Sequence, residues 1–392
     1  MASPTTSSSP APAPDATASS AAGVPTAAVQ DVRLDFPVAE GVVRRPDAER
    51  AEVLAAPGFG RHFTDHMARA VWTPAGWGSD AVVAHAPITL SPASAVLHYA
   101  QEVFEGLKAY RHEDGSVWAF RPEANARRFA ASARRLALPV LPEDAFLRSV
   151  EQLVAADLDW VPGGGEDSLY LRPFMFASES FLGVRPSAEV TYLVIASPAG
   201  PYFGGGEIRP VSIWLSQEYS RAAPGGTGAA KCGGNYAAGL QAQAEASAHG
   251  CDQVAFLDAV EHRWVEELGG MNLFFVLDDG TVVTPELTGT ILEGVTRTSV
   301  LQIAADLGHD VVERRVDVAE WRDGCASGRV REVFACGTAA VVTPVGALVE
   351  PGRRSVPGDG GTGEVTATIR ARLTDVQTGR GEDVHGWMHR LV

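Results

Sequence analysis

The stretch PGGTGAAKCGGNY, residues 224–236, places Lys231 inside a run of glycine and other small residues. The chain of 392 residues contains one other lysine, Lys108, and its remaining basic side chains are arginines. Small neighbours let backbone and ligand approach the ammonium group closely. Arginine cannot be deprotonated in a protein, whereas a lysine with a lowered pKa acts as a nucleophile and forms a Schiff base. Chemistry that needs a primary amine is therefore expected at Lys231.

Composition and charge limit the class of protein. With 45% hydrophobic residues the chain can bury a large core, and its length predicts two domains. The net charge of −16 argues against binding to nucleic acid or to a membrane surface, because both recruit basic patches. The four cysteines show no C-x-x-C spacing, which indicates free thiols in a reducing compartment and no metal cluster. They are Cys232, Cys251, Cys325 and Cys336.

Residues 1–28 are rich in Ala, Ser, Pro and Thr, and no basic residue precedes Arg33. This stretch matches neither a secretory signal nor an arginine-rich transit peptide, so we predict a disordered tail. No apolar run approaches the ~20 residues that span a bilayer. The cytoplasm is the expected location.

Helical and strand patterns are mixed in both halves of the chain, which predicts an α/β or α+β protein. The apolar spacing predicts helices at 122–138, 142–158, 236–249 and 296–307. Strands are expected at 71–77, 81–92, 168–176, 190–197, 211–216, 253–258, 271–277, 281–285 and 331–338. The glycine- and proline-dense segment 198–206 is the predicted linker between a small N-terminal domain, 29–197, and a larger C-terminal domain, 207–392.

Two motifs after Lys231 have both a chemical and a structural interpretation. In EELGGMNLF, residues 266–274, Glu267 could pair with a protonated ring nitrogen, or be a solvated turn residue. The motif LTGTILEGVTR, residues 287–297, leads into a predicted helix. The N–H groups of Val295 and Thr296 could bind a phosphate there, or Thr296 could simply cap the helix.

Two further features also have both a chemical and a structural interpretation. The N–H groups of Thr338 and Ala339 follow a predicted strand and could bind a carboxylate, or these small residues could serve tight packing. Arg128 could clamp a phosphate, or be exposed to solvent. Nucleotide-binding loops are disfavoured, because the residues around Lys231 break the P-loop pattern and no strand-linked G-x-G-x-x-G begins either half.

Taken together, seven blocks resemble the branched-chain amino-acid aminotransferases, which belong to the class IV pyridoxal-phosphate (PLP) enzymes together with D-amino-acid aminotransferase. The blocks are FTDHM (63–67), FEGLKAY (104–110), FRP (120–122) with Asn125 and Arg128, YLRP (170–173), KCGGNY (231–236), ELGGMN (267–272) and FACGTA (334–339). The resemblance runs from about Phe59 to the C-terminus. It implies the two-domain D-amino-acid-aminotransferase-like fold, PLP as cofactor, and a homodimer.

The resemblance also implies a role for each matching residue. Lys231 would bind PLP covalently and relay a proton between the α-carbon of the substrate and C4′ of the cofactor. Glu267 would hold the ring nitrogen protonated, and Tyr236 would lie at the phenolic oxygen. The phosphate would be held by Arg128 and the N–H groups of Val295 and Thr296. Thr338 and Ala339 would bind the substrate carboxylate, with Thr338 also beside the cofactor.

The implied substrate pocket is apolar and aromatic, and accepts an alkyl chain or a glutamate side chain. Its residues are Phe59, Tyr99, Phe104 and Tyr170, with Val184 from across a dimer interface and Arg172 for the distal carboxylate. Gly270 replaces a threonine of some relatives, which leaves substrate breadth open. Ala340 and Thr343 replace a redox-active C-x-x-C, so no thiol switch is expected. Lys108 is given no catalytic role.

The implied reaction is transfer of the amino group of L-leucine, L-isoleucine or L-valine to 2-oxoglutarate by a ping-pong mechanism. Two alternatives share the cofactor class, namely a D-amino-acid aminotransferase and an aminodeoxychorismate-type lyase. An alternative of a different class is a catalytically silent dimeric binding protein. FEGLK at 104–108 and the pair Tyr170 and Arg172 favour the branched-chain enzyme.

Overall fold

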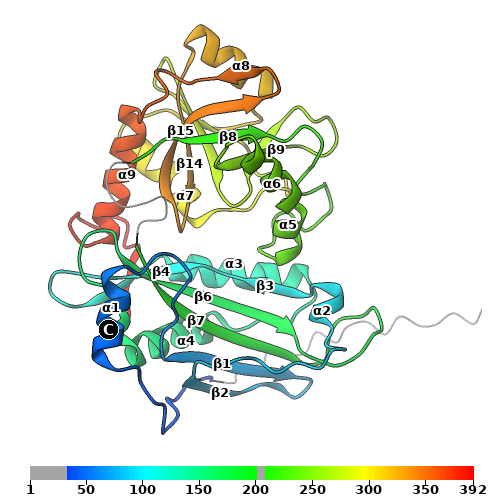
Figure 1. Ribbon diagram of the computed structural model, residues 1–392, viewed down its shortest axis with the longest axis vertical. Coiled ribbons are helices and arrows are strands. Elements are labelled where there is room, and N and C mark those ends of the chain that lie inside the picture. The colour runs from blue at the N-terminus through cyan, green and yellow to red at the C-terminus, as the bar shows by residue number, and fades with distance from the viewer. Residues whose placement is uncertain (1–32, 201–207) are drawn as a thin grey trace, which may run out of the picture. The chain divides into compact units, whose positions relative to one another are not determined.

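The computed structural model describes residues 33–200 and 208–392. Residues 33–392 group into one unit that contains two β-sheets (Figure 1). The predicted tail, 1–28, lies outside the described residues, and so does 201–206 of the predicted linker. Pro198 and Ala199 form the end of strand β7 (Val190–Ala199). The division into domains at 198–206 stays a prediction.

The first sheet has eight strands, all paired antiparallel, in the order β17-β5-β4-β6-β7-β1-β2, with β3 also on β6. Its other strands are β1 (His66–Thr73), β2 (Gly76–Ala84), β3 (Glu102–Phe104), β4 (Leu107–Arg111), β5 (Val117–Phe120), β6 (Ser168–Ala177) and β17 (Met388–Arg390). The predictions of strands at 71–77 and 81–92 were wrong in their bounds. Residues 74 and 75 form the turn of a β1–β2 hairpin, and β2 ends at Ala84.

Helices α3 (Pro122–Arg135) and α4 (Glu143–Ala156) pack on each other beside this sheet (Figure 1). The helix predicted from 122 does begin at Pro122, whose fixed φ suits the first turn of a helix. Phe129 of α3 contacts Phe146 of α4 and Tyr192 of β7 at ring-centroid distances of 5.5 and 5.7 Å. This aromatic contact fixes α3, which carries Arg128.

The second sheet has nine strands in the order β10-β9-β8-β15-β14-β11-β12-β13, with β16 on β15. The strands are β8 (Val211–Leu215), β9 (Gln253–Leu257), β10 (Val265–Leu268), β11 (Asn272–Leu277), β12 (Val282–Thr284), β13 (Val311–Glu313), β14 (Val330–Gly337), β15 (Val341–Glu350) and β16 (Arg353–Ser355). An additional pairing between Glu267 of β10 and Asn272 of β11 closes six of these strands into a ring. Glu267 therefore lies on the strand that completes the closure.

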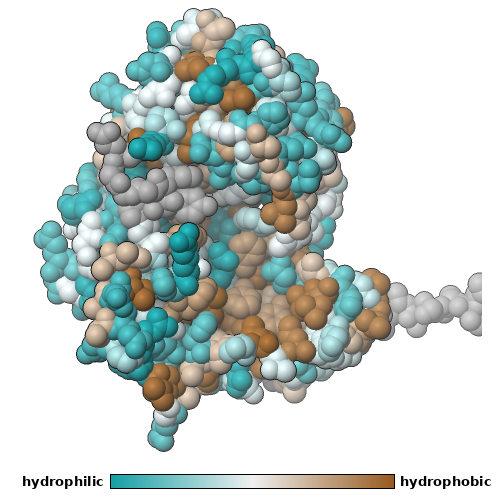
Figure 2. Space-filling view, in the orientation of Figure 1, coloured by the Kyte–Doolittle hydropathy of each residue, from teal (hydrophilic) through white to brown (hydrophobic). Residues whose placement is uncertain are grey.

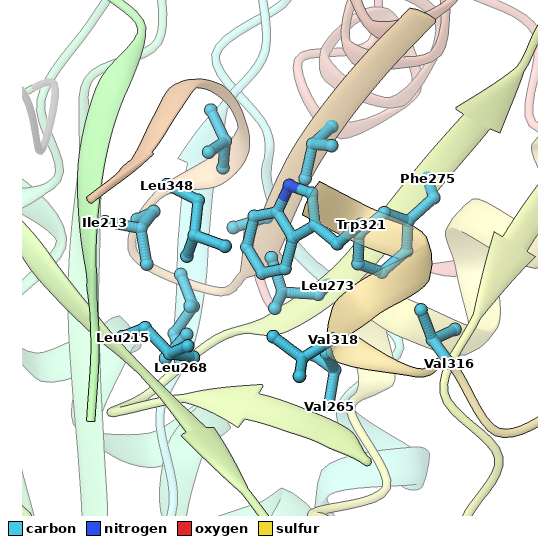
Figure 3. Close-up of a cluster of buried hydrophobic side chains, with 14 of the residues drawn as sticks. Ile213, Leu215, Val265, Leu268, Leu273, Phe275, Val316, Val318, Trp321 and Leu348 are labelled. Carbon is cyan, nitrogen blue, oxygen red and sulfur yellow. The ribbon is translucent and has the colours of Figure 1, made fainter. Parts of the chain in front are cut away.

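Buried apolar side chains pack against the second sheet, as Figure 3 shows for the cluster around Trp321. Trp321 is fully buried and meets Phe275 edge to face, with ring centroids 5.1 Å apart. Leu268 and Val265 bring β10 into the same cluster. Burying such side chains contributes about 1.5–3 kcal/mol each, so the strand that carries Glu267 is held by the core.

The remaining helices are α1 (Asp47–Ala55), α2 (Val96–Tyr99), α5 (Gly233–Ala238), α6 (Leu240–Ala248), α7 (Val295–Asp306), α8 (Val318–Ser327) and α9 (Glu364–Gln377), with a 3-10 turn at Leu158–Trp160. The helix predicted at 236–249 is two helices, α5 and α6, that meet at Gly239. The sequence pattern missed α1, α8 and α9. No helix in the described residues is long and apolar enough to cross a membrane.

The C-terminal strand β17 returns to the first sheet and pairs with β5. His389 of β17 makes two ionic contacts, through Nδ1 to Glu123 of α3 (2.7 Å) and through Nε2 to Glu151 of α4 (2.9 Å). Burial alone would lower the pKa of His389, but the hydrogen bonds to Glu151 and Glu123 outweigh it and raise the pKa. The charged imidazolium thus ties the C-terminus to both helices.

We expect this contact to make stability depend on pH. Because the folded pKa of His389 is raised, its contribution is fully present below the unfolded value of about 6.5 and is lost as pH rises through the folded value. His389→Gln should lower the free energy of unfolding by at most about 1 kcal/mol at pH 6, since the groups are partly exposed, and by less at pH 9. Urea unfolding of both proteins at the two pH values measures this. An equal loss at both would contradict it.

Candidate active site

Lys231 lies between Phe104 of β3 and Tyr236 of α5. Its Nζ donates to Tyr236 Oη at 2.9 Å and lies 4.9 Å from the centroid of the Phe104 ring. The backbone N–H of Lys231 donates to Ser132 Oγ of α3, and Phe104 N–H donates to the carbonyl of Lys231. Contacts from β3 and α3 therefore hold the backbone of Lys231, and Tyr236 holds its amine.

The loop before Lys231 is shaped by its small residues. Buried Asn235 donates from Nδ2 to the carbonyls of Thr227 and Ala230, each at 2.8 Å, which fixes the turn into α5. A Cβ atom at Gly228 would lie 2.4 Å from the carbonyl oxygen of Thr290. Only glycine fits there, because this loop and the segment before α7 touch backbone to backbone.

Glu267 is buried on β10, with 3% of its surface exposed, so the interpretation as a solvated turn residue was wrong. Its Oε1 accepts from Leu292 N–H at 2.9 Å and contacts Arg221 Nη2 at 2.5 Å. Its Oε2 accepts from Asn272 Nδ2 at 3.2 Å. Burial raises the pKa of Glu267 to about 7, and Arg221 is the largest influence in the opposite direction.

Arg128 is partly buried, with 11% of its side chain exposed, so the alternative of solvent exposure was wrong. It forms a bidentate ion pair with Glu105, at 2.7 Å from Nε to Oε1 and 2.8 Å from Nη2 to Oε2. Burial alone would raise the pKa of Glu105, but Arg128 lowers it below its ordinary value. The third guanidinium nitrogen donates to the carbonyl of Glu293 at 2.9 Å, at the entrance of α7.

Val295 is the first residue of α7 and Thr296 the second, and Gly294 precedes them without a side-chain cap. The interpretation of Thr296 as the cap was therefore wrong. The first N–H groups of a helix have no acceptor within it and carry partial positive charge. Arg128 contacts the residue just before this helix start, and free N–H groups at a helix start are of the kind that binds phosphate.

Thr338 and Ala339 form the turn between β14 and β15. Thr338 Oγ1 donates to the carbonyl of Gly106 at 3.1 Å, and Lys108 Nζ donates to the carbonyl of Ala339 at 3.1 Å. Burial lowers the pKa of Lys108 to about 8. The second lysine thus supports the back of this turn, a function the sequence did not indicate.

Four residues of the predicted pocket pack together beside Lys231, namely Phe59, Phe104, Tyr170 and Arg172. Phe59 and Tyr170 pack edge to face with ring centroids 5.0 Å apart. The Arg172 guanidinium lies over the Phe104 and Tyr170 rings, 4.9 and 5.4 Å from their centroids. Its Nη2 donates to Tyr170 Oη at 3.2 Å, and its Nε is buried without a partner among the described residues.

Tyr99 and Val184, by contrast, are not part of this cluster. Tyr99 is 38% exposed and its hydroxyl donates to the carbonyl of Leu182, while Val184 is 87% exposed. Neither has a hydrogen bond or ring contact with the Lys231 cluster among the described residues. Figure 2 shows hydrophobic side chains gathered over the part of the face where Figure 1 places α2. These two residues therefore lie on an exposed apolar surface that also includes Leu97 and Leu182.

A cavity of about 300 Å³ opens beside Tyr236 and is bounded by Gly270, Thr338 and Ala339. A Cβ atom at Gly270 would lie 3.8 Å from Tyr236 Cε1, which is an ordinary van der Waals contact. A Cβ atom would fit here, so packing does not require glycine at this position, and the missing side chain widens the cavity. Ala340, the neighbour of this turn, is buried and carries no thiol.

The fold and this site together define a class of protein, a PLP-dependent aminotransferase. The profile of the amino-transferase class IV family matches residues 102–348. The chain belongs to this family.

Relatives of this chain carry a more specific description. It is 59% identical over 348 residues to a probable branched-chain-amino-acid aminotransferase of Streptomyces coelicolor, covering 88% of this chain and 96% of that protein. It is 56% identical over 363 residues to the branched-chain-amino-acid aminotransferase of Mycolicibacterium smegmatis, covering 91% and 98%. The Escherichia coli branched-chain amino acid aminotransferase structure superposes with a TM-score of 0.70 at 29% identity, covering 83% of this chain and all of that one.

The residues present fit PLP, the cofactor of the family. The structure of another branched-chain amino acid aminotransferase, with pyridoxamine 5'-phosphate, superposes with a TM-score of 0.69 at 32% identity, covering 83% of this chain and 99% of that one. In this chain, the uncapped start of α7 and Arg128 suit a phosphate, and Glu267 Oε2 has capacity for one more donor. The Nζ of Lys231 lies within the same cluster.

Proposed function

We propose that this protein transfers the amino group of L-leucine, L-isoleucine or L-valine to 2-oxoglutarate, with PLP bound at Lys231. The observation that carries the proposal is the Arg172 guanidinium within the aromatic cluster of Phe104 and Tyr170. Aromatic walls suit an alkyl side chain, and a guanidinium with a free donor suits a carboxylate. One pocket can therefore accept the two unlike substrates of a ping-pong reaction.

Six residues would contact four parts of the cofactor. Lys231 would hold the cofactor covalently, and Tyr236 would lie at its phenolic oxygen. Arg128 and the N–H groups of Val295 and Thr296 would neutralise the phosphate, and Glu267 would hold a proton at the ring nitrogen. When bound, PLP supplies an electron sink for the negative charge that forms at the substrate α-carbon.

The chain's own residues would supply binding and proton transfer. The N–H groups of Thr338 and Ala339 would bind the α-carboxylate of the amino acid, and Lys108 keeps their turn in position through the Ala339 carbonyl. Lys231 Nζ would remove the proton from the substrate α-carbon and deliver it to C4′ of the cofactor, and carry it back in the other half-reaction. The hydrogen bond to Tyr236 Oη orients this amine.

We further propose a homodimer in which Tyr99 and Val184 complete the pocket of the partner subunit. Both belong to the exposed apolar surface around α2, with Leu97 and Leu182 59% and 65% exposed. Apolar side chains gathered at a surface are typical of protein interfaces. The contribution of both residues would then depend on dimer formation.

The proposed function is tested with purified holoenzyme, L-leucine and 2-oxoglutarate. We expect a visible absorbance band that shifts when L-leucine is added, and formation of L-glutamate after 2-oxoglutarate. Formation of a D-amino acid would favour a D-amino-acid aminotransferase, and release of pyruvate from aminodeoxychorismate a lyase. A protein without any visible band would instead support the silent binding protein.

Arg172→Met should separate the two half-reactions. The methionine keeps most of the apolar contact but loses the charge, so the KM for 2-oxoglutarate should rise about 10- to 100-fold, the loss typical of a hydrogen bond to a charged group. The half-reaction with L-leucine should change far less. Single-turnover measurements with each substrate test this, and equal losses in both would contradict the assignment of Arg172.

A further inference from the structure

Arg221 is a buried cation in direct contact with Glu267, ten residues before Lys231. Its Nη2 lies 2.5 Å from Glu267 Oε1, and each side chain is 4% exposed. The same nitrogen donates to the carbonyls of Gly228 and Thr290 at 3.0 and 2.6 Å. The Arg221 guanidinium thus contacts three segments: the loop before Lys231, the segment before α7 and strand β10.

The two oxygens of Glu267 have different surroundings. Oε1 contacts Arg221 Nη2 and accepts from the N–H of Leu292. Oε2 accepts only a 3.2 Å hydrogen bond from Asn272 Nδ2 among the described residues. Because a carboxylate oxygen accepts about two hydrogen bonds, Oε1 is saturated and Oε2 can take one more donor. Arg221 and Leu292 therefore occupy Oε1 and leave Oε2 with capacity for a further donor.

The charged and titratable groups near Glu267 are few. Arg221 and the more distant Lys231 favour the anion, whereas the neighbouring Glu266 opposes it. Burial raises the pKa of the Cys336 thiol well above its ordinary value, so that group stays neutral. Within 33–200 and 208–392, Arg221 is the one cationic side chain in an ion pair with Glu267.

We propose that Arg221 is a positioning residue that keeps the proton shared by Glu267 and the cofactor's ring nitrogen on the nitrogen. This inference rests on the proposed function, because it requires PLP beside Glu267. The shared proton can leave the carboxylate anionic and the ring cationic, or leave both groups neutral. A permanent positive charge beside Oε1 stabilises the carboxylate and so favours the first arrangement. The cationic ring is the stronger electron sink.

The test is the protonation state of the ring nitrogen in the holoenzyme, measured by NMR with PLP labelled with ¹⁵N at that position. We expect a protonated nitrogen in the wild type and in Arg221→Lys, which keeps the charge. In Arg221→Met the nitrogen should be unprotonated at the same pH. The kcat of Arg221→Met should fall about 10- to 100-fold, while the KM for L-leucine should change little.

Two further variants separate this effect from general destabilisation. Arg221→Gln is neutral but can still donate to the two carbonyls, and it replaces the methionine variant if that protein does not fold. Arg322→Met removes a comparable pair, Arg322 with Glu350, away from the site, and should leave the ¹⁵N signal unchanged. A charge effect predicts the same neutral nitrogen in both Arg221→Met and Arg221→Gln.

A protonated nitrogen in a neutral Arg221 variant would overturn the inference while leaving the proposed function intact. Loss of the protonated signal in Arg221→Lys to the same extent as in Arg221→Gln would also overturn it, because the charge is then not what matters. A wild-type protein that binds no PLP would instead remove the proposed function, and this inference with it.

Discussion

Replacing Lys231 with alanine is expected to abolish transamination, with kcat/KM at least about 10⁴-fold lower, the upper range of what a general base contributes. The amine beside Tyr236 Oη serves both as the covalent attachment point and as the proton carrier, and alanine supplies neither function. Non-covalent binding should persist in part, because Arg128, the start of α7 and Glu267 do not depend on the lysine side chain. Turnover and cofactor retention are measured on the same preparation.

The composition of the chain makes the attachment point simple to locate. With Lys231 and Lys108 as its only lysines, borohydride reduction followed by peptide mapping has two possible side-chain sites. We expect the adduct at Lys231 in the wild type and none in Lys231→Ala. Lys108→Met serves as the control and should keep the adduct at Lys231. An adduct at Lys108, or turnover in Lys231→Ala, would contradict the assignment.

Glu267→Gln is expected to lower kcat at least about 100-fold, the loss typical of removing one preorganised electrostatic contact. The amide has nearly the same shape and can keep the hydrogen bond that it accepts from Leu292 N–H, but its NH2 group cannot accept from Asn272 Nδ2. It carries no negative charge, however, and so cannot hold a proton on the ring nitrogen. Steady-state rates with L-leucine and 2-oxoglutarate measure the loss.

The adjacent residue supplies the matched control for this variant. Glu266 lies on the same strand and is also buried, but it accepts from Thr290 Oγ1 and has no part in the proposed reaction. Glu266→Gln should therefore keep most of its activity. Similar losses in both variants would mean that the strand is disturbed, and a wild-type rate in Glu267→Gln would contradict the role of Glu267.

The parts of the fold that the sequence predicts are those with regular apolar spacing. Helices α3, α4 and α7 and strands β6, β7 and β14 lie close to their predicted positions, because the helices show helical apolar spacing and the strands are short apolar runs. Helix α8 carries the core residue Trp321 but little other apolar periodicity, and it was missed. The return of β17 to the first sheet depends on a long-range pairing that no local pattern indicates.

The site was predicted in a similarly uneven way. Motif blocks identified Lys231, Tyr236, Glu267 and Arg128, and the structure brings the segments around them together. The residues behind them were missed, namely Glu105 behind Arg128, Arg221 and Asn272 at Glu267, and Lys108 behind Ala339. Glu105, Lys108 and Asn272 lie within motif blocks, but their roles depend on which side chain or carbonyl each one contacts, and the motifs do not show that.

Closure of the second sheet at Glu267 and Asn272 has a consequence for how this chain tolerates change. Because Glu267 pairs with Asn272 across the 269–270 turn, one residue inserted into this turn would move Glu267 back to the place of Glu266. The protein would still present a carboxylate, but one aimed at Thr290. The number of residues between β10 and β11 thus matters for the site in addition to the identity of the acid, because it decides which residue takes the position of Glu267.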